Sequence, residues 1–263
     1  MQENQNTQTT EAEALQAKQM GFLQQGDIDG MVEGCYAADA RIHGFTFRAE
    51  GYAALKELIR LYLSRLSTLG ERTIDKFTVG KNFIWMEMTI QNPQGNPVKI
   101  YEVKFIQNGK FYLQLFGLRQ GTVWQPDDFS GFKAPDSSIA RAFHSRYLEF
   151  HSEGDFNGLA DDFFTEDAQL ITARVDVAGR EAIRQMFQDL FAKESGFTPL
   201  SVENITNDRD YIWFEATVKS SLGERRVYDV MLFREGKVHL QLVGSLMGTL
   251  PTEVAFANDT TTS

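Results

Sequence analysis

Apolar side chains in this chain recur at helical spacing in some stretches and alternate with polar ones in others. In the second half, Ile139, Phe143, Tyr147 and Phe150 lie three or four positions apart, which predicts a helix ending at Gly154. A shorter helix, a strand and a longer helix are expected next, and the remainder alternates with period two. The predicted order is therefore helix, helix, strand, helix and then an antiparallel run of strands.

Two of the predicted strands, at residues 83–90 and 211–218, have unlike faces. One face is apolar, and the other combines a tryptophan with a glutamate: Trp85 and Glu87 in the first, Trp213 and Glu215 in the second. We expect the apolar face to cover the helices and the mixed face to pack against another sheet. The alternative is that the mixed face lines a ligand pocket. In the last strand the leucines are expected to face the helices and Gln241 to face away.

The two halves of the chain repeat each other. A shift of 128 positions aligns residues 26–30 (GDIDG) with 154–158 (GDFNG), and after a one-residue gap 113–115 (LQL) meets 240–242 (LQL). Roughly a quarter of the paired positions are identical over more than a hundred residues. Because such a period is long enough for a domain with its own core, the repeat predicts two homologous domains.

The repeat also predicts where these domains begin and end. We expect domains at residues 11–123 and 138–250, joined by a linker at 124–137 that contains two prolines and no apolar period. The aromatic side chains of this linker predict a strap lying on a surface. Residues 1–10 and 251–263 are rich in polar side chains and are predicted to be disordered tails.

The composition of the chain excludes several classes of protein and of partner. The chain has 26 basic and 36 acidic side chains and a net charge of −10, which argues against a nucleic-acid partner. Its single cysteine excludes a disulfide scaffold. No apolar run approaches the roughly 20 residues of a membrane span, and the first ten residues lack the pattern of a signal peptide. We therefore expect a cytoplasmic protein with no membrane partner.

Several short motifs resemble a known superfamily. They are residues 25–32 (QGDIDGMV), 36–42 (YAADARI), 51–58 (GYAALKEL) and 108–111 (NGKF), with counterparts in the second half. They resemble the nuclear transport factor 2-like superfamily and, within it, the SnoaL-like and ketosteroid isomerase-like domains. The resemblance implies two tandem cone-shaped α+β domains, each a bent antiparallel sheet wrapped around helices with an apolar pocket. Members include isomerases, polyketide cyclases, epoxide hydrolases and non-catalytic modules, so the fold alone does not select a function.

Tyr147 and Asp229 are the candidate catalytic residues. Tyr147 interrupts an apolar helix stripe, and the resemblance places an oxyanion-stabilising tyrosine there. The resemblance matches Asp229 to an acid that stays protonated in an apolar pocket and acts as a second donor. Two alternatives stay open. Tyr147 is a core tyrosine whose hydroxyl donates a hydrogen bond to a backbone carbonyl, or Asp229 lies on the outer face of the sheet.

Further ligand contacts are expected from polar and aromatic side chains predicted to face the two pockets: Gln19, Phe22, Tyr62 and Glu102 in the first repeat, and Phe150, Thr172 and Phe187 in the second. The general base of the isomerase-like pattern is missing. Its place is taken by Gly44 and Thr172, neither of which accepts a proton at neutral pH. His144 and His151 predict a packed or solvated pair rather than a metal site, so neither a metal nor a cofactor is expected.

These observations support two hypotheses. The first is a SnoaL-like protein that binds a small apolar molecule, with isomerase-type or polyketide cyclase-type activity in the second domain. The second is a non-catalytic association or scaffold module, in which the two domains form an intramolecular pseudo-dimer and further self-association stays open. The sizes of the pockets distinguish them.

Overall fold

A computed structural model describes residues 2–248 except residues 94, 123, 126 and 194–197. The chain divides after Pro135 into two compact units, residues 1–135 (unit 1) and 136–263 (unit 2). This division lies within the segment expected to be a linker. The tail expected at residues 251–263 lies outside the described residues. Among the described residues, no helix is both long and apolar enough to cross a membrane.

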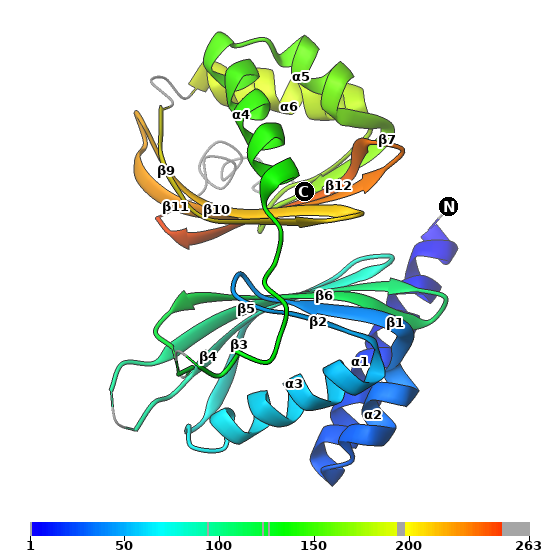
Figure 1. Ribbon diagram of the computed structural model, residues 1–263. Helices are drawn as coiled ribbons and strands as arrows, with labels where there is room; N and C mark the ends of the chain where they lie inside the picture. Colours follow the sequence, from blue (N-terminus) through cyan, green and yellow to red (C-terminus); the bar gives the residue numbers. More distant parts are fainter. Residues whose placement is uncertain (1, 94, 123, 126, 194–197, 249–263) are drawn as a thin grey trace. The chain divides into compact units, whose positions relative to one another are not determined.

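Unit 1 consists of three helices and six strands in the order α1 (Gln2–Gln25), α2 (Ile28–Cys35), β1 (Tyr36–His43), β2 (Arg48–Glu50), α3 (Gly51–Leu66), β3 (Arg72–Val79), β4 (Phe83–Ile90), β5 (Val98–Gln107) and β6 (Lys110–Gln120). The strands form one sheet in the order β2-β1-β6-β5-β4-β3. The three helices lie on one face of this sheet (Figure 1).

Unit 2 repeats this order with α4 (Ser138–Glu153), α5 (Phe156–Phe163), β7 (Phe164–Ile171), β8 (Asp176–Ala178), α6 (Arg180–Lys193), β9 (Thr198–Asp208), β10 (Tyr211–Ser220), β11 (Gly223–Arg234) and β12 (Lys237–Met247). Its sheet has the equivalent order β8-β7-β12-β11-β10-β9. The predicted α+β class and the tandem repeat of one fold are confirmed.

The sheets differ from the prediction in one detail, because they are mixed rather than antiparallel. The first long strand of each unit pairs in parallel with the last, β1 with β6 and β7 with β12. The intervening helix and four strands are long enough to return the chain in the same direction, which a tight hairpin cannot do.

The N-terminal segment also differs from the prediction. Residues 2–10, expected to be a disordered tail, form the first turns of α1. Periodicity could not reveal this, because the segment lacks apolar residues. It equally lacks glycine and proline, so nothing in its sequence breaks a helix that begins before the apolar stripe.

The Asp-x-x-Gly motif of the repeat caps the second helix of each unit. The carboxylates of Asp27 and Asp155 accept hydrogen bonds of 2.8 Å from the backbone N–H groups of Gly30 and Gly158. A Cβ atom at either glycine would lie 2.2 or 2.4 Å from the aspartate Oδ2 atom, so only glycine fits. The duplicated motif therefore marks the same local structure in both units.

The apolar faces of β4 and β10 point toward the helices, as predicted. Ile84 on β4 and Ile212 on β10 belong to the hydrophobic cores of their units. The prediction for the last strand was wrong. The pairing of β12 with β11 shifts between Leu232 and Phe233, which inserts one residue near His239. This bulge reverses the alternation, so Val238 packs in the core while Gln241, three residues later, also faces inward.

Candidate functional site

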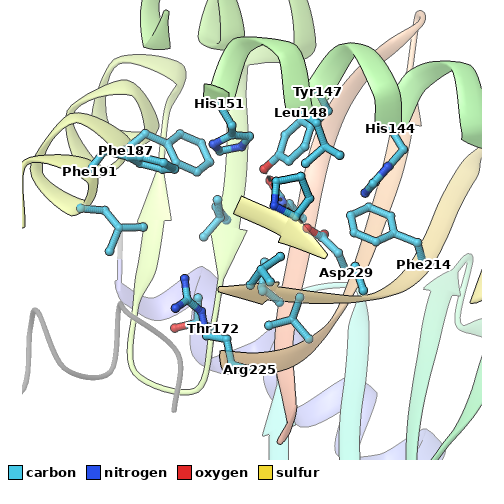
Figure 2. Close-up of a pocket in the computed structure, with 18 of the residues that line it drawn as sticks. His144, Tyr147, Leu148, His151, Thr172, Phe187, Phe191, Phe214, Arg225 and Asp229 are labelled. Atoms are coloured by element: carbon cyan, nitrogen blue, oxygen red, sulfur yellow. Dashed lines mark hydrogen bonds between the residues drawn. The ribbon is translucent and has the colours of Figure 1, made fainter. Parts of the chain in front are cut away.

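Unit 2 contains a cavity of about 130 Å³ between its helices and the inner face of its sheet (Figure 2). An engineered apolar cavity of about 150 Å³ holds benzene, so this volume suits roughly one six-membered ring. The lining is mostly aliphatic and aromatic: Leu148, Leu170, Met186, Phe187, Leu190, Phe191, Pro199, Phe214, Ala216, Val218, Val227 and Val243. The polar lining residues are His144, Tyr147, His151, Thr172, Arg225, Asp229 and Gln241.

Tyr147 and Asp229 meet at this cavity through a glutamine. The Gln241 amide Nε2 donates to the Tyr147 hydroxyl at 3.3 Å and to Asp229 Oδ2 at 2.8 Å. Figure 2 shows Tyr147 reaching down from α4 and Asp229 reaching up from β11. Both side chains are buried, at 7% and 5% exposure. The register that places Asp229 inward is thereby established, and Tyr228 faces the opposite side, against Gly244.

Asp229 is uncharged over much of the neutral range. Burial raises the pKa of this carboxyl to about 8, and the hydrogen bond from Gln241 offsets only part of that effect. Because Oδ2 accepts from Gln241, the proton resides on Oδ1, which has no hydrogen-bond partner among the described residues. Burial also raises the pKa of Tyr147 far above its usual range. The cavity wall therefore carries two neutral O–H donors close together.

The two histidines of α4 line the same cavity. Burial lowers the pKa of His144 to about 4, and burial followed by the nearby His144 lowers that of His151 to about 3. The His144 ring packs edge-on against Phe214, and the His151 ring lies 4.4 Å from Tyr147. Both imidazoles are therefore neutral near pH 7. The expectation of a packed pair agrees with these contacts.

Of the other residues expected at the second pocket, Thr172 and Phe187 line the cavity. The Thr172 hydroxyl accepts hydrogen bonds of 3.2 and 3.1 Å from the backbone N–H groups of Arg174 and Val175, so it also holds the turn before β8. Within the described residues, no cluster of three or more His, Cys, Asp and Glu side chains is arranged to hold a metal ion.

Phe22 and Phe150 are not among the residues that line the two described cavities. Each lies in the last turns of the first helix of its unit, where its ring packs over the glycine of the Asp-x-x-Gly motif. A Cβ atom on Gly30 would lie 2.9 Å from the Phe22 ring, and one on Gly158 would lie 2.4 Å from the Phe150 ring. The two rings therefore occupy the space that the absent side chains of these glycines leave open, and they lie outside the linings of the two described cavities.

The equivalent cavity in unit 1 is only about 40 Å³. Polar side chains fill the region that is open in unit 2. Lys104 donates to Gln19 at 2.5 Å and forms a buried ion pair with Glu102 at 2.7 Å. Gln19 in turn donates to the Tyr36 hydroxyl, which donates to Gln114. Gln19 and Glu102 are thus occupied by neighbouring side chains, whereas Tyr62 lines the small cavity.

The linker segment formed by residues 124, 125 and 127–132, here called the strap, contributes Trp124 to the lining of this small cavity. Trp124 packs against both Tyr62 and Phe116, and Phe129 stacks on Phe47 with ring centroids 4.3 Å apart. An ion pair between Arg65 on α3 and Asp128 anchors it. The predicted surface strap is therefore present, and its aromatic rings complete the core of unit 1.

Sequence reasoning missed two polar residues of the unit 2 site. Gln241 was assigned to the wrong face because the bulge in β12 is invisible to a period-two pattern. Arg225 was not singled out, although a signal existed: the repeat alignment pairs it with Val98, an apolar residue in the first half. The shared fold does not require a charged side chain at this position, because unit 1 has a valine there.

Comparisons with known proteins agree with this description. The model of the SnoaL-like domain family matches residues 144–240. No curated protein matches the chain.

Three solved structures illustrate the similarity. An NTF-2 like protein of unknown function from Burkholderia xenovorans LB400 is 19% identical, with a TM-score of 0.36, and the match covers 42% of this chain and 84% of that one. An LEH-like epoxide hydrolase of M. tuberculosis is 16% identical (TM-score 0.36; 42% and 85% covered). A protein with a ketosteroid isomerase-like fold from Catenulispora acidiphila DSM 44928, in complex with trimethylamine, is 14% identical (TM-score 0.31; 34% and 72% covered).

At these identities and scores, nothing about activity transfers from the solved structures to this chain. The family match covers most of unit 2, and unit 1 repeats the same order of helices and strands. Residues 144–240, which lie in unit 2, therefore match the SnoaL-like domain family, and unit 1 repeats the fold of the unit that contains them.

Proposed function

We propose that unit 2 binds a small, largely apolar molecule that carries a carbonyl or enol oxygen, and stabilises negative charge on that oxygen. The observation that carries this proposal is the pair of buried O–H groups, Tyr147 and Asp229, joined through Gln241 at the wall of a 130 Å³ cavity. Fixed donors in an apolar surrounding favour an oxyanion because no water has to be reorganised around it.

The remaining lining limits the chemistry that this unit performs. Isomerase- or cyclase-type reactions require a base that removes a proton next to the carbonyl. Among the described lining residues, the uncharged basic groups are the imidazoles of His144 and His151, whose pKa values are lowered to about 4 and 3. Such weak bases act only on an acidic carbon. The proposed substrate is therefore an activated compound such as a 1,3-dicarbonyl, as in polyketide cyclase-type chemistry.

Binding of a phenol tests this proposal, because a phenol presents an enol-like oxygen on a ring of suitable size. We expect Tyr147→Phe and Asp229→Leu each to weaken the binding of 4-nitrophenol at pH 7 by about tenfold or more, since a hydrogen bond to a charged group contributes about 1.5–3 kcal/mol. Isothermal titration calorimetry measures this. Tyr62→Phe in unit 1 is the matched control and should leave the affinity unchanged. Equal affinity in the wild type and both unit 2 variants would remove the oxyanion site.

For unit 1 we propose a structural role, which is the alternative function restricted to one half of the chain. The buried network around Lys104 and the strap leave a cavity of only about 40 Å³. The mixed faces of β4 and β10 support an intramolecular pseudo-dimer, because aromatic and hydrogen-bonding groups together are typical of interface cores. On these faces Glu87 accepts from Arg119, and Glu215 accepts from Arg226. We place the protein in the cytoplasm, supported by its single cysteine, Cys35, which is buried.

A further inference from the structure

His144 presents an imidazole to the cavity of unit 2 without a protein partner for its ring nitrogens. It lies on α4, lines the cavity and is 6% exposed. Its ring packs edge-on against Phe214, with the ring centroids 4.6 Å apart. Within the described part of the chain, neither ring nitrogen of His144 takes part in a hydrogen bond. A neutral imidazole has one nitrogen that accepts a proton, so His144 can serve as a base toward a molecule in the cavity.

The other histidine of α4, His151, is enclosed by aromatic rings. The centroid of its ring lies 4.4 Å from that of Tyr147, 5.4 Å from that of Phe187 and 5.1 Å from that of Phe191. Burial, followed by the nearby His144, lowers the pKa of His151 to about 3, whereas burial lowers that of His144 to about 4. His151 therefore belongs to the aromatic packing around Phe187, and His144 is the stronger base of the two.

His144 stands next to both O–H groups of the proposed oxyanion site. It precedes Tyr147 by three residues on α4, which places the two side chains on one face of the helix with Cβ atoms about 5–6 Å apart. Phe214, on which the His144 ring packs, pairs directly with Asp229 of β11. Figure 2 shows His144 reaching into the cavity from α4, on the side of Phe214 and Asp229. A ligand oxygen at Tyr147 and Asp229 therefore places the neighbouring carbon within reach of His144.

The start of α4 is fixed against β9, which holds His144 in place. The backbone N–H of Ala140 donates to Asn207 Oδ1 at 3.0 Å, and the backbone N–H of Asn207 donates to the Asp136 carbonyl at 2.9 Å. Ala140 and His144 are about one helical turn apart, so these bonds set where the imidazole lies over β10. A base held in this way needs no reorientation when a substrate binds.

The fold does not require a base at this helix position. The equivalent residue in unit 1 is Gln16, whose side-chain oxygen accepts a hydrogen bond of 3.0 Å from the Lys104 ammonium. An amide does not take up a proton at neutral pH. Of the two equivalent positions, the one with the imidazole lies at the cavity of about 130 Å³, and the one with the amide lies in the unit whose cavity is about 40 Å³. This difference points to a chemical role for His144.

We propose that His144 is the general base of unit 2, and that it removes the proton from the carbon between the two carbonyl groups of a 1,3-dicarbonyl compound. The inference rests on the proposed function for the position of the substrate oxygen. The carbon–hydrogen bond breaks, the proton moves to a ring nitrogen of His144, and the electron pair forms the carbon–carbon double bond of an enolate held by Tyr147 and Asp229. Transfer of the same proton to the enolate oxygen gives the enol and restores the neutral imidazole.

The test uses the keto–enol conversion of 2-acetylcyclopentanone in the presence of the full chain. An enol-rich stock is diluted into buffer at pH 7, and ultraviolet absorbance follows its return to equilibrium. We expect the wild type to accelerate this conversion. His144→Gln, which installs the unit 1 residue, should lower kcat by about 100-fold or more and leave KM nearly unchanged, because a positioned base contributes about 10²–10⁴-fold to the rate. Imidazole added to His144→Ala should restore part of the lost rate, since it can occupy the space of the missing ring.

His239→Gln is the matched control, because His239 lies outside the lining of the cavity, and it should keep the wild-type rate. Circular dichroism establishes that each variant is folded. A wild type without activity, or a His144→Gln variant as fast as the wild type, would overturn the inference, while binding of 4-nitrophenol that depends on Tyr147 and Asp229 would still support the oxyanion site.

Two further outcomes separate the roles of these residues. A rate that is lost in His144→Gln and that imidazole does not restore in folded His144→Ala would assign His144 to packing, and would also overturn the inference. A rate that depends on His144 but is unchanged in Tyr147→Phe and Asp229→Leu would support the inference and contradict the proposed function.

Discussion

At the scale of single residues, the two units show how few changes separate a filled core from an open cavity. Gln19 and Tyr147 occupy equivalent helix positions, and Glu102 and Asp229 equivalent strand positions. In unit 1 the acid is paired with Lys104, whereas in unit 2 the equivalent of that lysine is Met231. Without a cation beside it, the buried Asp229 holds its proton and becomes a donor.

This protonation gives the stability of unit 2 a defined dependence on pH. The carboxyl has a pKa of about 8 in the folded chain and about 3.9 in the unfolded chain, so between these values the folded state holds a proton that the unfolded state has lost. The contribution of this carboxyl to stability therefore falls as pH rises from about 4 to 8 and is flat outside that window. We expect the unfolding free energy of Asp229→Asn to increase relative to that of the wild type as pH rises across this window, by up to about 1.4 kcal/mol per pH unit.

Urea denaturation at pH 5, 6.5 and 8 measures this gain as the difference in unfolding free energy between variant and wild type. Only its slope against pH matters, since the substitution also changes the hydrogen bond to Gln241 by an amount that does not depend on pH. A difference that stays constant or shrinks toward pH 8 would show that Asp229 is ionised in the folded chain.

Tyr147 and Asp229 could be picked from the sequence because each stands out against an apolar pattern and matches a known motif. No motif identifies Arg225, because its position at the cavity depends on how β11 pairs with β10. Phe22 and Phe150 were assigned to the pockets since helical spacing identifies an apolar face but not the glycine under each ring. Patterns along the chain therefore identify unusual residues more readily than their contacts.

At the scale of helices and strands, the repeat predicted the order of elements in both units, and the errors have local causes. The bulge near His239 turned Gln241 inward, and the polar start of α1 has no period to detect. The strap shows the opposite case. Its aromatic residues were recognised in the sequence, but only the structure shows that they complete the core of unit 1 over Phe47 and Tyr62.

Because the strap contributes to that core, its aromatic residues should stabilise unit 1. We expect Phe129→Ala to lower the free energy of unfolding by about 2 kcal/mol, less than for a fully buried ring because Phe129 is partly exposed. Thermal and urea denaturation measure the loss. The exposed neighbour Asp127→Ala is the control and should change stability by less than about 0.5 kcal/mol. An effect of Phe129→Ala as small as that of the control would mean that the strap does not belong to the core.

At the scale of the whole molecule, one fold occurs twice, and we propose different roles for its two copies. The proposed pseudo-dimer predicts that the mixed sheet faces limit access to the linker. We expect Trp85→Ala and Trp213→Ala each to increase the rate of proteolysis within residues 133–137, because local opening exposes the chain. Phe77→Ala, at a side chain 44% exposed on β3, is the control and should leave the rate unchanged. An unchanged cleavage rate in both tryptophan variants would show that these faces do not form the proposed pseudo-dimer interface.

The proposal that unit 2 alone binds a ligand is tested most directly by NMR of the glutamine side chains. Gln241 lies in the unit 2 cavity beside Tyr147 and Asp229, and its equivalent, Gln114, lies at the small cavity of unit 1. In the full chain labelled with ¹⁵N at glutamine side-chain amides, titration with 4-methylphenol should shift the Gln241 resonances saturably and leave those of Gln114 in place. Shifts at Gln114, or no saturable shift at Gln241, would contradict a binding site built by unit 2 alone.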